Sequence, residues 1–161
     1  MGTTLVGEEA NESSVTGFWQ TMDDKTGRPQ SIVALYPYRG LYFGRMVVTF
    51  DDSGKLSDTI NDPKDRAPGV VGNPYYSGMD IIWDMKKEGS KYVGGKIIDP
   101  EKGDIYDAEM WLSHGRLIVR GEILFFGENQ TWLPAVESDF PPNFKKPDLN
   151  QFIPVIPTVK H

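Results

Sequence analysis

The residues that could carry catalysis in this sequence of 161 residues are few and poorly placed for it. The chain has two histidines, His114 and His161, and no cysteine. His114 falls in a short Ser-His-Gly turn and His161 is the last residue. We therefore expect no third group to orient either ring, as a catalytic triad requires. Without cysteine there is no thiol nucleophile, disulfide or thiolate metal site, and two exposed histidines do not supply the ligands of a zinc site.

Carboxylates are the other candidates for chemistry. Asp99, Glu109 and Glu122 could form an acid–base pair, but nothing in the sequence brings them together. Most other carboxylates fall in turns, where aspartate accepts hydrogen bonds from the backbone. The segment 99–104, DPEKGD, lacks the alternating oxygen donors of a calcium loop and is better explained as a turn. We expect no enzymatic activity, no metal and no cofactor; an enzyme would lose turnover when Glu109 or Glu122 is changed.

The charge of the chain excludes two classes of partner. Lys and Arg number 17 and Asp and Glu 23, which gives a formal net charge of −6. Binding to nucleic acid or to anionic lipid would need clustered basic residues. No apolar run approaches the roughly 20 residues of a membrane-spanning helix. The chemistry left to consider is binding inside an apolar interior.

The elements that could build such an interior are strands. Aromatic and β-branched residues concentrate in eight segments, at 17–21, 31–36, 41–50, 79–85, 91–98, 104–112, 116–125 and 129–135. Most connections are short and contain Asp, Pro or Gly, so neighbouring strands should pair as an antiparallel meander. Apolar and polar residues alternate along several segments, which predicts one buried face. The fold class is therefore all-β, an eight-stranded up-and-down barrel; a sandwich, with longer cross-connections, is the alternative.

Three parts of the chain follow from this pattern: a flexible segment at 1–16, the barrel at 17–136 and an extended tail at 137–161. The tail holds five of the 12 prolines and either packs along the barrel or reaches a protein partner. The long connection 51–78 interrupts the barrel and is expected to be a lid over its opening or a mobile coil, with a short helix inside it as a further alternative.

An ordered series of short motifs runs through the barrel segment. It contains Gly17-Phe18-Trp19, the turn 23–29, Leu41 to Arg45, the stretch 94–106, Leu117 to Gly121, and Gln130-Thr131-Trp132. In this order they resemble the bacterial domain-of-unknown-function family numbered 2147, over about residues 17 to 134; the set is specific, although no single motif is. The resemblance implies a small periplasmic or secreted protein with a lipocalin-like (calycin-type) barrel and no assigned ligand. Because no signal peptide is visible, we expect one to have been removed.

The sequence departs from that family in two places. Many members carry a cysteine pair in the connection that corresponds to 60–75, and residues 61–71 contain none here. The proline-rich tail lies outside the usual pattern, so its role is particular to this protein. Gly17-Phe18-Trp19 also resembles the opening motif of lipocalins, where the tryptophan closes the barrel and a late arginine lies across it. By that resemblance Trp19 and Arg120 have a structural, barrel-closing role.

The alternation places seven bulky side chains on inward faces, where they could line a ligand cavity: Tyr42, Met46, Val48, Trp83, Tyr106, Met110 and Trp132. Gly44, Gly95 and Gly121 fall on the same side and would leave room there. We therefore predict a carrier that holds a small, largely apolar, lipid-like molecule outside the cytoplasm. The alternative is a protein-interaction module, with a filled barrel and an acidic surface or tail that contacts a partner.

Overall fold

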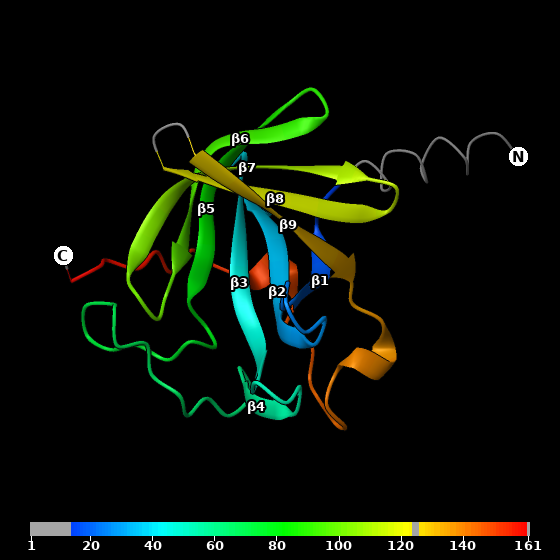
Figure 1. Ribbon diagram of the computed structural model, residues 1–161, viewed down its shortest axis with the longest axis vertical. Coiled ribbons are helices and arrows are strands. Elements are labelled where there is room, and N and C mark those ends of the chain that lie inside the picture. The colour runs from blue at the N-terminus through cyan, green and yellow to red at the C-terminus, as the bar shows by residue number, and fades with distance from the viewer. Residues whose placement is uncertain (1–13, 124–125, 161) are drawn as a thin grey trace, which may run out of the picture.

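The computed structural model describes residues 14–123 and 126–160, and its regular secondary structure there is almost entirely strand (Figure 1). The N-terminal residues 1–13 and His161, for which expectations were stated above, lie outside the described residues. The strands are β1 (Gly17–Met22), β2 (Pro29–Tyr38), β3 (Leu41–Phe50), β4 (Leu56–Thr59), β5 (Asp80–Glu88), β6 (Lys91–Asp99), β7 (Asp104–Ser113), β8 (Arg116–Ile123) and β9 (Phe126–Pro134). Two short 3-10 helices follow, η1 (Glu137–Asp139) and η2 (Leu149–Gln151).

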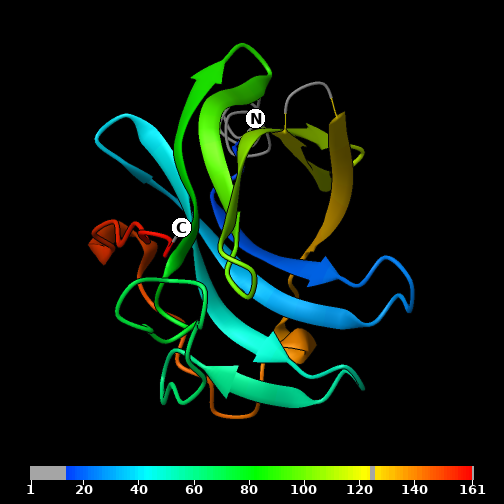
Figure 2. The ribbon, with the colours of Figure 1, turned by 60° about the vertical axis from the view of Figure 1, so that its left-hand side comes forward.

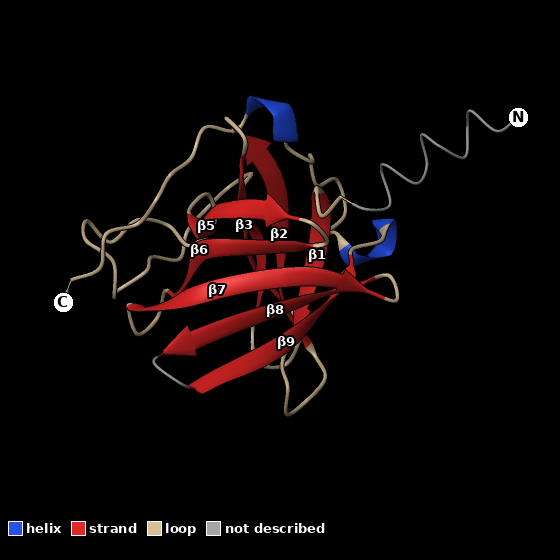
Figure 3. Cartoon of the chain, turned by 90° about the horizontal axis from the view of Figure 1, so that it is seen from above, coloured by secondary structure: helices blue, strands red, loops and turns tan. Residues whose placement is uncertain are grey.

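Eight of these strands close into a barrel. The pairing runs β2-β1-β9-β8-β7-β6-β5-β3, and β2 also pairs with β3, so the sheet has no free edge along this circuit. All pairings are antiparallel. Figure 3 shows β5 to β9 as one wall, with β1 to β3 crossing behind it. The predicted antiparallel barrel is confirmed, and the sandwich is excluded.

The strand boundaries follow the sequence pattern with two differences. β9 begins at Phe126, earlier than the expected 129, so the end of the predicted 116–125 strand falls in the connection, where residues 124–125 are outside the described part. A short strand, β4, forms within the connection 51–78 and pairs with the end of β3 outside the barrel circuit. Its sequence, LSDT, is too short and too polar to be recognised from alternation.

Hairpin turns at the end of the barrel opposite the cavity use residues with positive φ. His114 (φ 54°) and Gly115 (φ 76°) form the two-residue link between β7 and β8, and Arg39 (φ 50°) and Gly40 (φ 82°) link β2 to β3 in the same way. A two-residue hairpin of type I′ needs this left-handed backbone at both positions. His114 is therefore a turn residue, as its sequence context predicts.

A β-bulge in β3 reverses the expected alternation. Ile32 pairs with Val48 and Val33 pairs with Met46, which leaves Val47 as an extra residue. Val47 and Val48 therefore both pack in a cluster on the outer side of the sheet, together with Ile32, Ala34 and Phe140. The prediction that Val48 faces the interior is wrong for this reason.

One end of the barrel is filled by side chains, and we call this set the floor. Its members are at most 7% exposed: Val15, Trp19, Leu35, Met85, Tyr92, Met110 and Leu117. Val15 precedes β1, in the segment expected to be flexible, yet it is fully buried, and its carbonyl accepts a hydrogen bond from Trp19 Nε1 at 2.8 Å. The barrel is therefore solid at this end.

Two of the three glycines expected to leave room instead allow close packing. A Cβ on Gly44 would lie 2.8 Å from Leu35 Cδ2. A Cβ on Gly95 would lie 2.3 Å from the Met85 sulfur and 2.4 Å from the carbonyl oxygen of Trp83. Neighbouring atoms already occupy the space at both positions, so these glycines contribute to the packed interior rather than to a cavity.

The tail packs along the outer side of the barrel, as Figure 2 shows for its orange and red segments. The Phe140 ring meets Phe18 edge-on at 5.5 Å between centroids and stacks on Phe144 at the same distance. Phe152 meets the Tyr36 ring edge-on at 5.0 Å. Of the two expectations for this segment, contact with the barrel is therefore observed.

The tail also joins the loop that precedes β5. Val71 N donates to Thr158 O at 2.7 Å, and Lys160 N donates to Gly69 O at 3.2 Å. Asn61 exchanges two hydrogen bonds with the backbone of Lys145. Loop and tail thus brace each other beside the barrel.

A buried polar network lies where the tail crosses β2, β3 and β5. Asp80, with no exposed surface, accepts from Arg45 Nε at 3.0 Å, Tyr36 Oη at 2.7 Å and Val155 N at 2.8 Å. Arg45 Nη2 donates to the carbonyl of Ile153 at 2.5 Å. Burial raises the pKa of Asp80, against the opposing effect of Arg45, and burial next to Asp80 raises the pKa of Tyr36. The network fastens the tail to the barrel.

Candidate functional site: a cavity at the open end of the barrel

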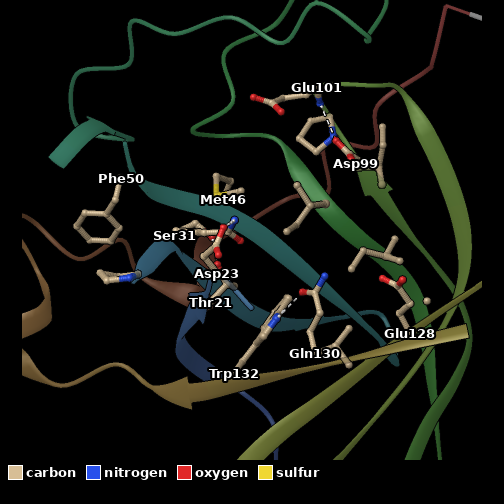
Figure 4. Close-up of a pocket in the computed structure, with 18 of the residues that line it drawn as sticks. Thr21, Asp23, Ser31, Met46, Phe50, Asp99, Glu101, Glu128, Gln130 and Trp132 are labelled. Carbon is tan, nitrogen blue, oxygen red and sulfur yellow. Dashed lines mark hydrogen bonds between the residues drawn. The ribbon is translucent and has the colours of Figure 1, made fainter. Parts of the chain in front are cut away.

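A cavity of about 1190 Å³ occupies the end of the barrel opposite the floor. Its mouth is formed by the turns β1–β2 and β6–β7 and by the start of the loop after β3. Figure 4 shows side chains from several strands converging on this space. Its volume is somewhat larger than the roughly 300–1,000 Å³ of cavities that bury a small molecule. The barrel is thus hollow at its open end and packed with side chains at the floor.

One side of the cavity is apolar. The strands β5 to β8 present aliphatic and aromatic side chains, Ile81, Ile97, Tyr106 and Val119, which we call the apolar wall. Gly121 belongs to the same wall: a Cβ there would lie 3.4 Å from Ile97 Cγ2 and 3.5 Å from Tyr106 Cβ, which are ordinary contacts. Of the three glycines expected to leave room, Gly121 is the one that lines the cavity.

The opposite side is polar, and we call Thr21, Ser31 and Gln130 the polar wall. Thr21 on β1 and Ser31 on β2 are cross-strand partners, both 5% exposed, with their hydroxyl oxygens 2.6 Å apart. Gln130 Oε1 accepts from Trp132 Nε1 at 3.0 Å, and this bond fixes the orientation of the amide. Figure 4 shows these side chains together with Met46 around the inner part of the cavity.

Carboxylates dominate the mouth. Asp23 accepts from the backbone of Thr26 and Lys25, and these hydrogen bonds lower its pKa. Asp51 accepts from the Ser53 hydroxyl and from Lys55 N, which lowers its pKa. The remaining acids that line the cavity are Asp52, Asp99, Glu101 and Glu128, and the cationic lining residues are Arg28 and Lys102. The opening is therefore acidic.

The seven predicted cavity residues divide into three groups. Met46, Tyr106 and Trp132 line the cavity. Met110 is fully buried in the floor, and Tyr42 packs edge-on against the floor residue Tyr92 at 4.8 Å between centroids. Val48 and Trp83 lie on the outer side of the sheet.

The position of Trp83 corrects the alternation assumed for β5. Trp83 pairs with Lys96, whose ammonium group bridges Asp107 at the exposed surface. Its neighbour Ile82 pairs with Ile97 of the apolar wall. The register of β5 against β3 shifts just before this point, so a strict period of two assigns Trp83 to the wrong face.

The barrel-closing pair predicted from the lipocalin motif is separated. Trp19 lies in the floor, two residues before the cavity-lining Thr21 on β1. Arg120 Nε donates to Glu122 at 2.7 Å and Nη1 donates to Asn129 at 2.9 Å, while its strand neighbours Val119 and Gly121 line the cavity. Arg120 therefore lies on the outer side of β8 and does not cross Trp19.

The lid expected in the connection 51–78 does not cover the mouth. Its first two residues, Asp51 and Asp52, line the cavity, whereas Ala67 and Val70 are buried in the core cluster beside the barrel. The rest of the loop is hydrogen-bonded to the tail and lies beside the barrel.

The residues considered for catalysis have structural partners. On the outer surface Glu109 lies 3.5 Å from the Lys91 ammonium, and Glu122 is bonded to Arg120. Asp99 Oδ1 accepts from Glu101 N and Lys102 N and so caps the β6–β7 turn. Among the residues that the structure describes, no group of three His, Asp or Glu side chains is arranged to hold a metal ion, and no helix is long and apolar enough to cross a membrane.

Sequence reasoning missed the polar wall and Glu128. The signal was present, because Trp132 was placed inward and a period of two puts Gln130 and Glu128 on the same face. The same period of two places Thr21 on the face of β1 that carries Trp19. The expectation that inward faces are apolar excludes these polar residues from the predicted site.

Comparison with known proteins agrees with this architecture. A protein from Helicobacter pylori, HP1028, described as belonging to the lipocalin family, is similar in structure with a TM-score of 0.62. It is 17% identical over 78% of this chain and 86% of its own, a likeness that shows the fold alone. No curated protein matches this sequence. A family model described as an uncharacterized protein conserved in bacteria, DUF2147, matches residues 17–133. The chain therefore belongs to the bacterial family DUF2147.

Proposed function

We propose that this protein binds a small, largely apolar molecule in the cavity at the open end of its barrel. The observation that carries the proposal is the open cavity of about 1190 Å³, lined on one side by the apolar wall, Met46 and Trp132 above a packed floor. Burial of apolar ligand surface in such a space is favourable by about 25 cal/mol per Å². The lipocalin-like fold supports the same function.

The proposed role is that of a carrier without covalent chemistry. Glu109 and Glu122, the acids considered for catalysis, are engaged in ion pairs on the outer surface, which supports this view. We further propose that the protein acts in the periplasm or outside the cell. The family resemblance supports this location, and fractionation of cells that express the full-length protein from its own promoter tests it.

A titration with the uncharged fluorophore N-phenyl-1-naphthylamine tests the function. We expect saturable binding at one site, with a rise in probe fluorescence as it enters the cavity. The variant Gly121→Leu projects a side chain from the apolar wall into the cavity and should weaken binding at least about tenfold. Thr131→Leu, on the outer side of β9, is the matched control and should bind normally. Native mass spectrometry of the purified protein would identify a molecule that copurifies.

Two results would contradict the proposal. If the fluorophore does not bind saturably, or if Gly121→Leu binds it as well as the unchanged protein does, the cavity is not the binding site.

One observation favours the alternative of a protein-interaction module. Three apolar side chains of the tail are exposed, Ile153 by 67%, Val155 by 47% and Ile156 by 46%. The packing of the tail against the barrel does not bury these three side chains. This alternative predicts that Ile153→Ser together with Ile156→Ser abolishes biological activity although fluorophore binding is intact.

A further inference from the structure

The polar wall has hydrogen-bonding capacity that the protein itself does not use. The hydroxyls of Thr21 and Ser31 carry two donor hydrogens, and the bond between them uses one. Gln130 accepts from Trp132 through Oε1, which leaves both hydrogens of its amide nitrogen. Within the described residues these side chains have no further hydrogen-bond partner. Donors and acceptors therefore face the cavity from β1, β2 and β9.

The charges around the cavity are strongly biased. Among the residues that the structure describes, six carboxylates and two cationic side chains line it. Arg28 already donates to the carbonyl of Asp52 at 3.1 Å, and Lys102 belongs to the β6–β7 turn at the mouth. The two walls themselves contain no cationic residue among those described. A ligand with an ionised carboxylate would pass an acidic mouth and find no countercharge inside.

We infer that the cavity selects a neutral amphiphile: a molecule with an uncharged hydrogen-bonding group, such as an amide or a hydroxyl, and an apolar body. The polar group bonds to Thr21, Ser31 and Gln130, and the apolar body lies against the opposite wall. Anionic amphiphiles such as fatty acids are disfavoured. This inference rests on the proposed function, because it specifies the ligand class of the same site.

Decanamide and decanoate provide the test, because they have nearly the same shape and differ in charge. Each is used at pH 7.5 to displace N-phenyl-1-naphthylamine from the unchanged protein. Decanamide should displace the fluorophore at concentrations about tenfold or more below those of decanoate. Glu128→Lys places a cation at the cavity. Decanoate should then displace the fluorophore at a lower concentration, which brings its effective concentration closer to that of decanamide.

A second arm tests the hydrogen bonds. The double variant Thr21→Val, Ser31→Ala removes both hydroxyls with little change of volume. Its affinity for decanamide, corrected for its own affinity for the fluorophore, should fall about tenfold. Thr131→Val, the same kind of change on the outer side of β9, should leave the affinity for decanamide unaltered.

The outcomes separate the inference from the proposed function. If the fluorophore binds but decanoate displaces it as well as decanamide does, or if the double variant binds decanamide normally, the inference is overturned and the carrier function stands. If the fluorophore itself does not bind, both are overturned.

Discussion

At the scale of single residues, the most consequential arrangement outside the cavity is the ion pair between Arg45 and Asp80. Both side chains are buried, and the partners of Asp80 include Tyr36 and the tail backbone. A buried charge is tolerated only while it is paired, because the interior solvates it poorly. Because Tyr36 lies on β2, Arg45 on β3 and Asp80 on β5, the tail is attached to three strands through this pair.

Replacement of Arg45 by methionine should therefore destabilise the protein strongly. Asp80 would remain buried without its countercharge, and the expected loss in free energy of unfolding is about 3–5 kcal/mol. Urea unfolding followed by tryptophan fluorescence measures it. The control is Lys96→Met, which breaks the exposed pair with Asp107 and should change stability by about 0.5 kcal/mol or less. Equal effects of the two substitutions would contradict the assigned role of the buried pair.

The turn after β3 should make stability depend on pH through Asp51. Hydrogen bonds from Ser53 and Lys55 lower its pKa in the folded protein. A lowered pKa means that the stabilisation is complete above about pH 4 and is lost as the pH falls through the folded value. The advantage of the unchanged protein over Asp51→Asn should therefore shrink on acidification from neutral pH to about pH 3.

Urea midpoints of both proteins across this range measure the effect. Ser53→Ala removes the donor with the largest influence on Asp51 and should show a weaker pH dependence than the unchanged protein. A constant difference between the Asp51→Asn variant and the unchanged protein at every pH would show that the turn does not lower the pKa of Asp51.

At the scale of elements, the tail acts as part of the folded domain. Phe140 is 9% exposed and contacts Phe18 and Phe144, so its ring covers the outer side of the sheet. Phe140→Ala should cost about 3 kcal/mol of unfolding free energy, because it leaves an unfilled space in this cluster. Ile153→Ala, at an exposed position of the same tail, should cost about 0.5 kcal/mol or less. A neutral Phe140→Ala variant in urea unfolding would mean that the tail is not required for stability.

The positions of the strands were largely predictable from the sequence. Which side chains of each strand point into the barrel was harder to predict. Turn residues and β-branched segments located the barrel strands because these signals are local. The inward or outward direction of a residue depends on an uninterrupted alternation, and a single bulge reverses it. The extra residue Val47 turned Val48 outward, and the shifted register of β5 did the same for Trp83. The bulge at Val47 has no local sequence signal such as glycine.

At the scale of the whole molecule, the barrel is half solid and half hollow. The floor is closed by tightly packed side chains, and Gly44 and Gly95 permit that packing. The cavity begins where β1 and β9 present Thr21 and Gln130 in place of apolar residues. The sequence predicted an interior with room for a ligand and three of its lining residues, Met46, Tyr106 and Trp132. The depth of the floor follows from contacts between distant strands, which alternation within each strand does not contain.

The methyl groups of the methionines provide the most direct measurement of binding in the cavity. Met46 lines the cavity, whereas Met85 and Met110 lie in the floor. In NMR spectra of protein with carbon-13 methionine methyl groups, N-phenyl-1-naphthylamine should shift the Met46 signal saturably, because its rings lie beside that methyl group. The signals of Met85 and Met110 should move much less. If the Met46 signal stays unchanged at saturating fluorophore, or if all three signals move alike, the claim that a small molecule binds in this cavity is wrong.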